Sequence, residues 1–315
     1  MSMYEPEKPY KHGLVTLIES TWRTPYVTVT RGVYPIIRKR FSGLEIQHTD
    51  GIGTKGIYHW RRKTFANAVV DALAMNLNDL ALVGAIPYML QDHITMPDMG
   101  SRTAMKIIQA LVRECKKRTI AIVGGETSHH NNVDAVDISM TVSGLITVPR
   151  KNRLMIGDVL IGLPSNGLHS NGFTKVRGMF GSDEWRPDFV RPTIIYLDSI
   201  MRLLKHCTIH GMMHITGGAF TKLKDILTES LDVTIDHSHS PRPQPIFFEL
   251  YERGVSSREM YTTFNCGIGF VLSSPEAEVK KILRFMRGAR IIGRVAKGKG
   301  RVHIQSAFDG SSVEL

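Results

Sequence analysis

Strand-like and helix-like segments alternate along the whole 315-residue chain, on both sides of a charged, proline-containing link at residues 149–152. Runs rich in β-branched and aromatic residues indicate strands, and apolar residues three and four positions apart indicate helices. A domain takes roughly 150 residues, so the length is sufficient for two domains with separate cores. The sequence therefore predicts an α+β protein with two α/β domains, residues 1–150 and 151–315.

The local patterns give approximate bounds for individual elements. In the first half, the pattern predicts strands at 26–34, 44–49, 88–95, 119–124 and 137–148, and helices at 64–83 and 101–118. In the second half, it predicts strands at 158–164, 212–216, 266–272, 289–295 and 301–305, and helices after Asn171 and at 192–206, 219–228, 246–254 and 275–288. Pro192 suits the first turn of its helix. The last two strands are expected to pair with each other.

Four short segments place glycines beside acidic, amide, hydroxyl or imidazole side chains at the ends of predicted strands. They are TDGIGTK (49–55), GGET (124–127), SNGLHSNG (165–172) and HITGG (214–218). Glycine lets backbone N–H groups approach an anion closely, and the N-terminus of a following helix adds a partial positive charge. The four segments therefore indicate a site for a phosphate-bearing ligand.

Carboxylates beside such turns would repel a phosphate group unless a cation lies between the two. Oxygen ligands of this kind suit Mg²⁺, which bridges readily to phosphate oxygens. The carboxylates that we interpret as candidate metal ligands are Asp50, Asp79, Glu126 and Asp137. Lys55 is the candidate counter-charge for the phosphate itself.

Each segment also has an interpretation without a ligand. DGIGTK could be an ordinary glycine turn, and Asn78 and Asp79 could cap a helix or face water. His169 could be a solvated loop histidine, and His214 a core histidine whose hydrogen bonds are satisfied. Cys266 is expected to pack as a small apolar residue. No Walker A loop is present, which excludes the P-loop motif.

Composition narrows the class of protein. No apolar run approaches the ~20 residues of a membrane-spanning helix, and the first 13 residues lack an apolar signal core. We therefore expect neither insertion into a membrane nor export. Three dispersed cysteines without a CxxC motif fit the reduced thiols of the cytoplasm. The net charge of +11 comes from short basic clusters without interleaved aromatics, so no specific nucleic-acid partner is expected.

The order of the motifs carries more information than any one of them. Six motifs follow one another between about Leu44 and Val295. In order, they are DGIGTK, MNLNDLALVGAIPY, VGGET, GDVLIGLPSNGLHSNGFTKVR, MHITGGAF and EMYTTFNCGIGF. This series closely resembles phosphoribosylformylglycinamidine cyclo-ligase, the aminoimidazole ribonucleotide synthetase of purine biosynthesis. GLHSNG followed by HITGG and TFNCGIG is specific to that enzyme within its ATP-binding superfamily, whereas DGxGTK is shared with relatives such as thiamin-monophosphate kinase.

The resemblance implies a homodimer whose N-terminal sheets join into a shared barrel, with the C-terminal sheets packed with helices outside it. The implied reaction is the ATP-dependent cyclisation of formylglycinamidine ribonucleotide to aminoimidazole ribonucleotide, with release of ADP and phosphate. ATP and Mg²⁺ are the implied cofactors, and a small ribonucleotide is the implied substrate.

The resemblance also implies a role for each matched position. Those implied for catalysis are His169, Asn171, Asp50 and His214, with His169 the best acid–base candidate. Those implied for the nucleotide and its metal are Asp50, Gly51, Gly53, Thr54, Lys55, Asp79, Gly125, Glu126, Thr127 and Asp137. Those implied for the substrate are Ser170, Asn171, Thr216, Gly217, Gly218 and Asn265. All are expected to meet in one cleft.

The chain departs from the family pattern in three places, and two other functions stay open. Residues 23–41 match a stretch that is usually glycine-rich but contain only Gly32, the loop after GGET is the short SHHNNVDAV, and the stretch GMFGSDEWRPDFV before Arg191 is also short. These differences predict a compact variant and bear on nucleotide affinity more than on fold. The alternatives are another ATP-using reaction of the superfamily, such as a small-molecule kinase, and a catalytically weakened paralogue that binds nucleotide or, through its charge, nucleic acid.

Overall fold

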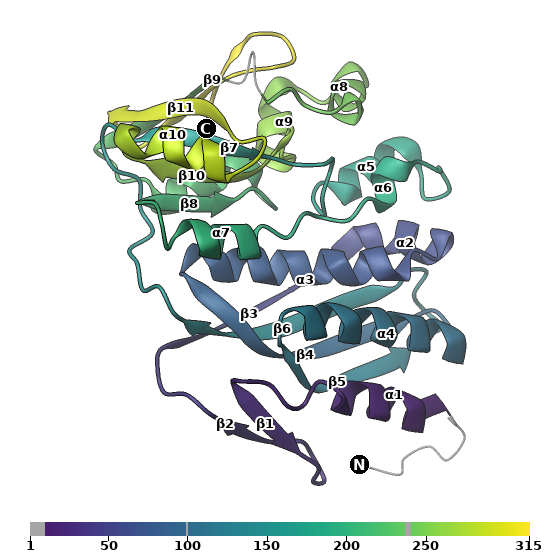
Figure 1. Ribbon diagram of the computed structural model, residues 1–315. Coiled ribbons are helices and arrows are strands. Elements are labelled where there is room, and N and C mark those ends of the chain that lie inside the picture. Colours follow the sequence, from purple (N-terminus) through teal and green to yellow (C-terminus); the bar gives the residue numbers. More distant parts are fainter. Residues whose placement is uncertain (1–9, 99, 237–240) are drawn as a thin grey trace.

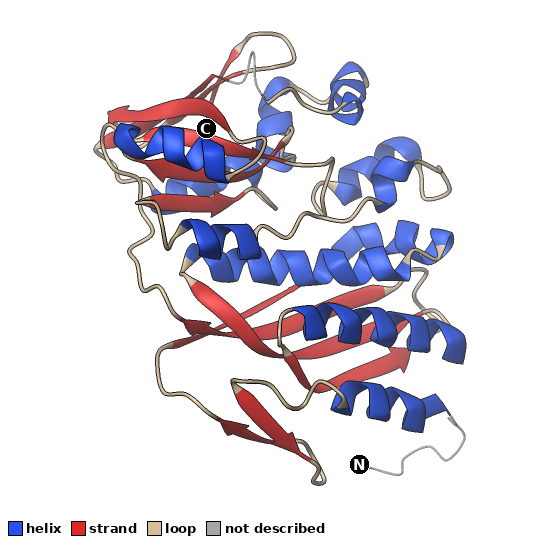
Figure 2. Ribbon diagram, in the orientation of Figure 1, coloured by secondary structure: helices blue, strands red, loops and turns tan. Residues whose placement is uncertain are grey.

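The computed structural model describes residues 10–98, 100–236 and 241–315, which form two units stacked on each other (Figure 1). The N-terminal half is the lower unit in that view, and the C-terminal half is the upper one. Both contain sheet and helices, which confirms the mixed α/β class (Figure 2). Residues 1–9, part of the stretch without a signal core, lie outside the described residues. Within the described ranges, every helix is too short or too polar to cross a bilayer.

The N-terminal unit contains a four-stranded sheet and a two-stranded hairpin. Its helices are α1 (Tyr10–Glu19), η1 (Gly53–Lys55), α2 (Gly56–Arg62), α3 (Phe65–Leu82) and α4 (Ser101–Lys117). Its strands are β1 (Val27–Thr30) and β2 (Ile36–Lys39) in the hairpin, and β3 (Glu45–Gly51), β4 (Ala85–Met96), β5 (Ala121–His129) and β6 (Asp137–Ile146) in the sheet. The sheet order is β3-β6-β4-β5, in which only β4 and β5 are parallel neighbours.

The two faces of this sheet differ because side chains alternate along each strand. Met140 and Val142 of β6 belong to the apolar core that also contains α3 and α4. Ser139 and Thr141 of the same strand line an open cavity of about 570 Å³ on the opposite face, which Tyr34 at the tip of the hairpin also borders. On the face turned away from the helices, the hairpin packs on an apolar area that includes Tyr88, Ala121 and Val123, and the cavity beside it has a partly polar lining.

The C-terminal unit is built on a seven-stranded sheet. Its helices are α5 (Phe173–Phe180), α6 (Pro187–Val190), α7 (Leu197–Leu203), η2 (Ala219–Ile226), α8 (Pro245–Glu252), α9 (Ser257–Thr263) and α10 (Glu276–Phe285). Its strands are β7 (Val159–Pro164), β8 (Gly211–His214), β9 (Leu231–Asp236), β10 (Ile268–Ser274), β11 (Arg290–Lys297), β12 (Val302–Gln305) and β13 (Ser312–Glu314). The order is β13-β12-β9-β11-β7-β10-β8, and only the β12–β9 neighbours are parallel. We propose that the link at 149–152, which lies between the last strand of one sheet and the first of the other, divides the two domains.

Three predicted elements differ from the structure. The strand predicted at 26–34 ends at Thr30, because the chain turns and returns as β2. The helix predicted from Pro192 begins only at Leu197, because the backbone N–H of Thr193 donates to a side chain of α3 instead of entering a helical turn. The strands predicted at 289–295 and 301–305 exist as β11 and β12 but do not pair, because β9 lies between them.

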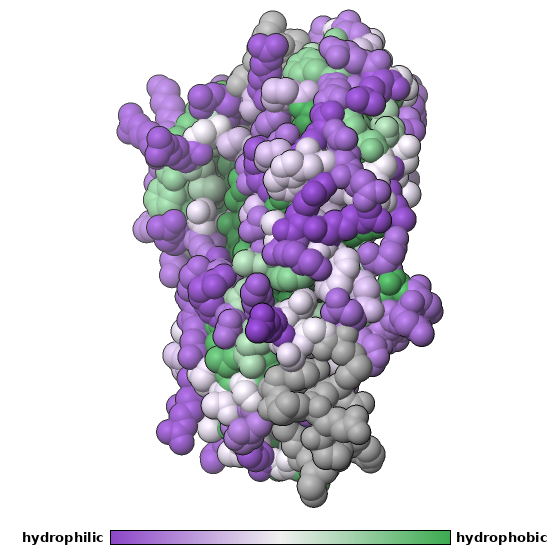
Figure 3. Space-filling model, turned by 90° about the vertical axis from the view of Figure 1, so that its right-hand side faces the viewer, coloured by the Kyte–Doolittle hydropathy of each residue, from purple (hydrophilic) through white to green (hydrophobic). Residues whose placement is uncertain are grey.

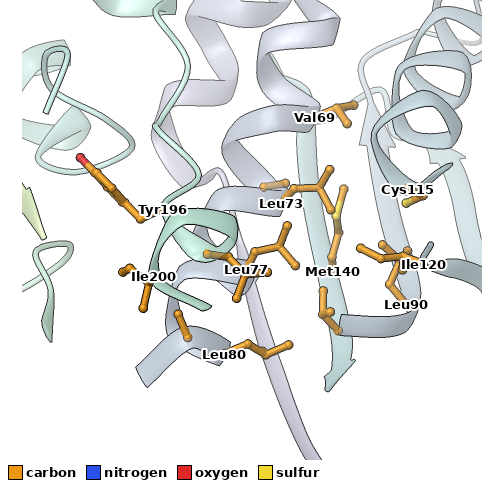
Figure 4. Packing of buried hydrophobic residues seen from close by; sticks show 14 of the residues in the cluster. Val69, Leu73, Leu77, Leu80, Leu90, Cys115, Ile120, Met140, Tyr196 and Ile200 are labelled. Carbon is orange, nitrogen blue, oxygen red and sulfur yellow. The ribbon is translucent and has the colours of Figure 1, made fainter. Parts of the chain in front are cut away.

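Helix α3 is buried between the two units, and its apolar side chains connect their cores. Leu73 and Leu77 lie between Ile200 of α7 on one side and Met140 of β6 on the other (Figure 4). One continuous cluster of buried side chains therefore extends across the domain boundary. On the face drawn in Figure 3, hydrophilic side chains predominate and hydrophobic ones form small separate areas.

A buried carboxylate on α3 reinforces this contact. Asp71 is fully buried, and its Oδ1 accepts hydrogen bonds from the N–H and hydroxyl of Thr193 (2.7 and 2.6 Å) and from the hydroxyl of Ser170 (2.9 Å). Lys55 Nζ donates to the same oxygen at 2.9 Å, and His59 Nε2 lies 2.8 Å from Oδ2. Burial by itself would raise the pKa of Asp71, but Lys55 and His59 outweigh it and hold that pKa well below its usual range.

We predict that Asp71→Asn destabilises the protein by about 3–5 kcal/mol, because the substitution leaves the Lys55 ammonium buried without its counter-charge. Glu252→Gln on α8 is the matched control, since that side chain is exposed and its loss should change stability by no more than about 0.5 kcal/mol. Urea unfolding followed by circular dichroism measures both. Equal midpoints for Asp71→Asn and the parent chain would contradict the assignment.

Candidate active site

Lys55 does not occupy the position predicted for a phosphate ligand. Its side chain is fully buried, and besides Asp71 its ammonium donates to the carbonyl oxygens of His169 (2.7 Å) and Arg191 (2.6 Å). Burial lowers the pKa of Lys55, although the charge of Asp71 opposes that shift. All three N–H donors of the Lys55 ammonium are therefore directed at protein oxygens. Through these bonds Lys55 holds the segment 165–172 against the N-terminal unit.

The remainder of TDGIGTK lies at the end of β3. Asp50 is half-buried, and its Oδ1 accepts the N–H of Gly51 at 2.7 Å, which leaves the second carboxylate oxygen available. Gly53 has φ of +54°, a left-handed conformation that starts the turn into η1. The hydroxyl of Thr54 lies 3.0 Å from that of Thr174 in the C-terminal unit. The motif is therefore both a turn and part of the domain contact.

Asn78 and Asp79 neither cap α3 nor face bulk water; they contact the C-terminal unit. Asp79 Oδ1 lies 2.9 Å from His214 Nδ1, and Asp79 Oδ2 lies 3.3 Å from His48 Nε2. Asn78 Oδ1 accepts the N–H of Tyr196 at 2.7 Å, and its Nδ2 lies 3.2 Å from His214 Nε2. Burial would raise the pKa of Asp79, but its two histidine partners hold it well below its usual range. Both ring nitrogens of the fully buried His214 are thus engaged within the protein.

The loop SNGLHSNG is held in place by Asn265. Asn265 Oδ1 accepts the hydroxyl of Ser165 at 2.8 Å, and its Nδ2 donates to the carbonyls of Gly167 (2.9 Å) and Leu168 (3.2 Å). Asn265 is fully buried, so it supports the loop and does not itself face a substrate. Cys266 is fully buried as well, in agreement with its prediction as a packing residue.

His169 has both ring nitrogens unpaired in this loop, where Asn166 Oδ1 and Asn171 Nδ2 also lack a partner among the described residues. The backbone of His169 is left-handed, with φ of +59°, and its side chain is buried. Burial, followed by the charges of His214 and Lys55, lowers the pKa of His169 to about 3. The ring is therefore neutral at physiological pH, with one nitrogen able to donate and the other able to accept.

Tyr196 and Gly269 define the space around the His169 ring. The Tyr196 hydroxyl donates to the carbonyl of Pro164 at 2.8 Å, and its ring centroid is 6.2 Å from that of His169. A Cβ added to Gly269 of β10 would overlap the Tyr196 hydroxyl and lie 2.6 Å from His169 Cε1. The position must therefore be glycine for the histidine to occupy its place.

Two of the predicted metal ligands lie on other strands of the sheet. Asp137 begins β6, two residues before Ser139, which pairs with Gly51 of β3, whereas Glu126 lies on β5 and borders the 570 Å³ cavity. Strands β6 and β4 separate β3 from β5, so Asp50 and Glu126 are roughly 14 Å apart at the usual strand spacing. Gly125 has φ of +152° and packs over Asp92, while Thr127 follows on the same strand. The described residues contain no group of three or more histidine, cysteine or carboxylate side chains arranged to hold a metal ion.

Asp92 lies beneath this region and is not a residue that the motifs indicated. Its side chain is almost fully buried, and a Cβ on Gly125 would lie 2.8 Å from its carboxyl carbon. Burial, with a smaller contribution from Glu126, raises the pKa of Asp92 to about 7. The carboxyl group is therefore partly protonated at neutral pH, which reduces the negative charge beneath the GGET turn.

The structure thus brings together one group of predicted residues and separates another. The group at the domain contact is Asp50, Gly51, Gly53, Thr54, Lys55, Asp79, His169, Ser170, Asn171, His214, Thr216, Gly217, Gly218 and Asn265. Gly125, Glu126 and Thr127 lie on β5 at the opposite edge of the sheet from β3, whereas Asp137 lies on β6, the strand that pairs with β3. Sequence reasoning missed His48, Asp71 and Tyr196. Of these three, only Asp71 could have been noticed in the sequence, because it is a carboxylate among the apolar residues of a predicted helix.

We predict that Gly269→Ala lowers stability by about 1–3 kcal/mol, because the added methyl group overlaps Tyr196 and displaces His169. The matched control is Gly178→Ala on α5, where a Cβ has no atom within 4 Å and should stabilise the helix slightly. Thermal unfolding measures both, and the His169 ring resonances report its displacement. A Gly269→Ala protein with parental stability and unchanged ring signals would refute this packing.

Comparison with known proteins identifies the family. The model of the AIR synthase related protein N-terminal domain matches residues 42–146, and that of the C-terminal domain matches residues 156–305. A phosphoribosylformylglycinamidine cyclo-ligase of Saccharolobus solfataricus is 32% identical over 306 residues, covering 94% of this chain and 92% of its own. One from Methanococcoides burtonii is 34% identical, covering 81% and 80%. The resemblance inferred from the motif order is confirmed.

Solved structures share the fold at lower identity. The hydrogenase maturation protein HypE in complex with ATP superposes with a TM-score of 0.71 at 18% identity, covering 99% of this chain and 96% of its own. Thiamine monophosphate kinase from Aquifex aeolicus gives 0.61 at 19% identity, covering 97% and 98%. From the family models and the cyclo-ligase relatives, this chain belongs to the AIR synthase related protein family.

Proposed function

We propose that this chain is an ATP-dependent cyclo-ligase that converts formylglycinamidine ribonucleotide to aminoimidazole ribonucleotide, with release of ADP and phosphate. The observation that carries the proposal is the 32% identity over 94% of the chain to a curated enzyme of that name. The geometry supports it, since the segments specific to that enzyme, GLHSNG, HITGG and TFNCGIG, lie together at the domain contact through Asn265, Asn78 and Lys55.

The reaction needs ATP because an amide oxygen is a poor leaving group. Transfer of the terminal phosphoryl group of ATP to the amide oxygen gives an iminophosphate and ADP. The amidine nitrogen of the substrate then attacks that carbon, the C–O bond breaks, and phosphate leaves as the ring closes. Both steps move negative charge on phosphoryl oxygens, so hydrogen-bond donors held in position supply most of the acceleration.

His169 is the residue we assign to contact the reacting atoms. Its ring is neutral, buried and without a partner among the described residues, so one nitrogen can accept a hydrogen bond from the attacking nitrogen while the other donates one. His214, by contrast, is engaged by Asp79 and Asn78, so we assign it to positioning. Asn171 and Ser170 flank His169 on the same loop and complete the substrate contacts.

Mg²⁺ enters this proposal as the partner of the ATP phosphates. The ion usually takes one or two carboxylates together with phosphate oxygens, so a dedicated cage of protein ligands is not required. Asp50 has a free carboxylate oxygen and no ion-pair partner among the described residues, which makes it the carboxylate best suited to the ion. When bound, Mg²⁺ neutralises charge on the phosphoryl oxygens.

We predict that the purified chain, given ATP, Mg²⁺ and formylglycinamidine ribonucleotide, produces aminoimidazole ribonucleotide and ADP in equal amounts. Mass spectrometry of the product and a coupled ADP assay measure the two. ADP formed with another phosphoryl acceptor, such as thiamin monophosphate, would favour the kinase alternative. Salt-sensitive nucleic-acid binding without nucleotide turnover would favour the weakened paralogue.

We predict that Asp50→Asn raises the KM for Mg-ATP about tenfold or more, because a charge near the phosphates is lost. The variant should unfold at the same temperature as the parent chain. Asp225→Asn is the matched control, since Asp225 is exposed on η2 and forms no ion pair in the described parts of the chain. Steady-state kinetics at saturating ribonucleotide measure the effect. Unchanged KM and kcat in Asp50→Asn would remove Asp50 from the site.

We also propose that two copies associate through the face of the N-terminal sheet turned away from the helices and act in the cytoplasm. The hairpin beside that face exposes Val33, Tyr34 and Ile36, with 77%, 81% and 62% of their surfaces accessible. Contiguous exposed apolar side chains of this kind are typical of protein interfaces. The three cysteines are all free and buried, which fits a reducing compartment.

We predict a particle of twice the 35.3 kDa chain mass in sedimentation equilibrium. Tyr34→Glu should shift the equilibrium to the monomer, because it puts a charge in the apolar contact. Trp185→Glu is the control, since Trp185 is 52% exposed in the C-terminal unit, away from the hairpin. A monomer in the parent chain would exclude the dimer.

A further inference from the structure

The turn that follows β8 presents backbone donors that no protein atom accepts. In the described part of the chain, the N–H groups of Thr216, Gly217 and Gly218 donate no hydrogen bond, although Ala219 N–H closes the turn onto the Thr216 carbonyl at 2.7 Å. Gly217 and Gly218 are exposed, and Gly218 has φ of +80°. Successive free N–H groups in such a turn form a concavity suited to an anion.

A lysine without a carboxylate partner lies beside this turn. Lys222, in the first half of η2, donates from Nζ to the Thr216 hydroxyl at 2.9 Å. Within the described ranges it forms no salt bridge, and its positive charge contributes to the low pKa of the nearby Asp79. Lys55, the lysine of the DGIGTK motif, cannot take this role because Asp71 and two carbonyls occupy it.

An orphaned amide provides the independent indication of a ligand. Asn171 is 6% exposed, and its Nδ2 has no hydrogen-bond partner among the described residues. A Cβ placed on Gly217 would lie 4.0 Å from Asn171 Oδ1, so the amide group lies beside the turn, and a 180° flip of the amide turns Nδ2 toward it. A buried donor without an acceptor is unfavourable in a folded protein, and a bound acceptor removes that penalty.

We propose that Thr216, Gly217, Gly218, Asn171 and Lys222 form a binding site for a terminal phosphate group carrying two negative charges. The donors are three backbone N–H groups of the turn, together with one amide and one ammonium that lie beside it. A tetrahedral anion with several acceptor oxygens matches this set of donors. The nearby Asp79 carboxylate stays ionised, with its oxygens close to His214 and His48, and the Lys222 ammonium contributes to its low pKa.

This inference rests on the proposed function, which supplies two groups of that chemistry. One is the 5′-phosphate of the ribonucleotide, and the other is the terminal phosphate of ATP. Kinetics distinguish the two sources. If Lys222→Met raises the KM for the ribonucleotide and not that for ATP, the site holds the 5′-phosphate; the converse result assigns it to ATP.

The decisive measurement is binding without turnover. Isothermal titration calorimetry of the full-length chain with inorganic phosphate and with ribose 5-phosphate gives a dissociation constant for each variant. Lys222→Met keeps the length of the side chain and removes its charge, so phosphate binding should weaken about tenfold or more. Lys224→Met is the matched control, since Lys224 is exposed and lies two residues further along η2. The Lys224→Met variant should bind phosphate with the same dissociation constant as the parent chain.

Asn171→Asp gives a second test, because it replaces the orphaned amide with a carboxylate that repels the anion. Binding of phosphate should then fall further than in Lys222→Met, with circular dichroism confirming that both variants are folded. Equal dissociation constants in the parent chain, Lys222→Met and Asn171→Asp would overturn the site. A parent chain that binds phosphate through Lys222 but makes no aminoimidazole ribonucleotide would refute the cyclo-ligase activity and leave the site standing.

Discussion

The carboxylate of Asp71 fixes the two halves of the molecule to each other, and the arrangement around His169 depends on it. One oxygen accepts donors from Lys55 of the N-terminal unit and from Ser170 and Thr193 of the C-terminal unit. Its negative charge keeps the Lys55 ammonium in the interior, and that ammonium in turn holds the His169 carbonyl. The left-handed backbone of His169 is therefore maintained from the other domain.

A second set of contacts aligns the same domain surface. Asn78 and Asp79 are adjacent on α3, yet they reach different partners: Asn78 holds the backbone at Tyr196, and Asp79 orients the ring of His214. Because both begin on one rigid helix, the distance between the loop 165–172 and the turn after β8 is determined by α3. The short polar motif NLND thus sets the geometry of two loops in the other domain.

The fold was largely predictable from sequence, and the site was predictable only in part. The long, strongly periodic segments gave α3 and α4 within a residue of their observed ends, because apolar spacing records which face is buried. Pairing was not predictable: nothing local in β11 and β12 shows that β9 lies between them. The motif residues were identified by type, but the burial of Lys55 depends on contacts 114 and 136 residues away, which no local pattern records.

The continuous apolar cluster through α3 limits how the molecule can move. Because the same helix contributes side chains to both halves, rotating one half against the other would expose Leu73, Leu77 and Ile200 to water. A hinge between the halves is therefore an improbable route for substrates to enter. Access to the His169 ring must instead come from rearrangement of short surface turns over a stationary scaffold.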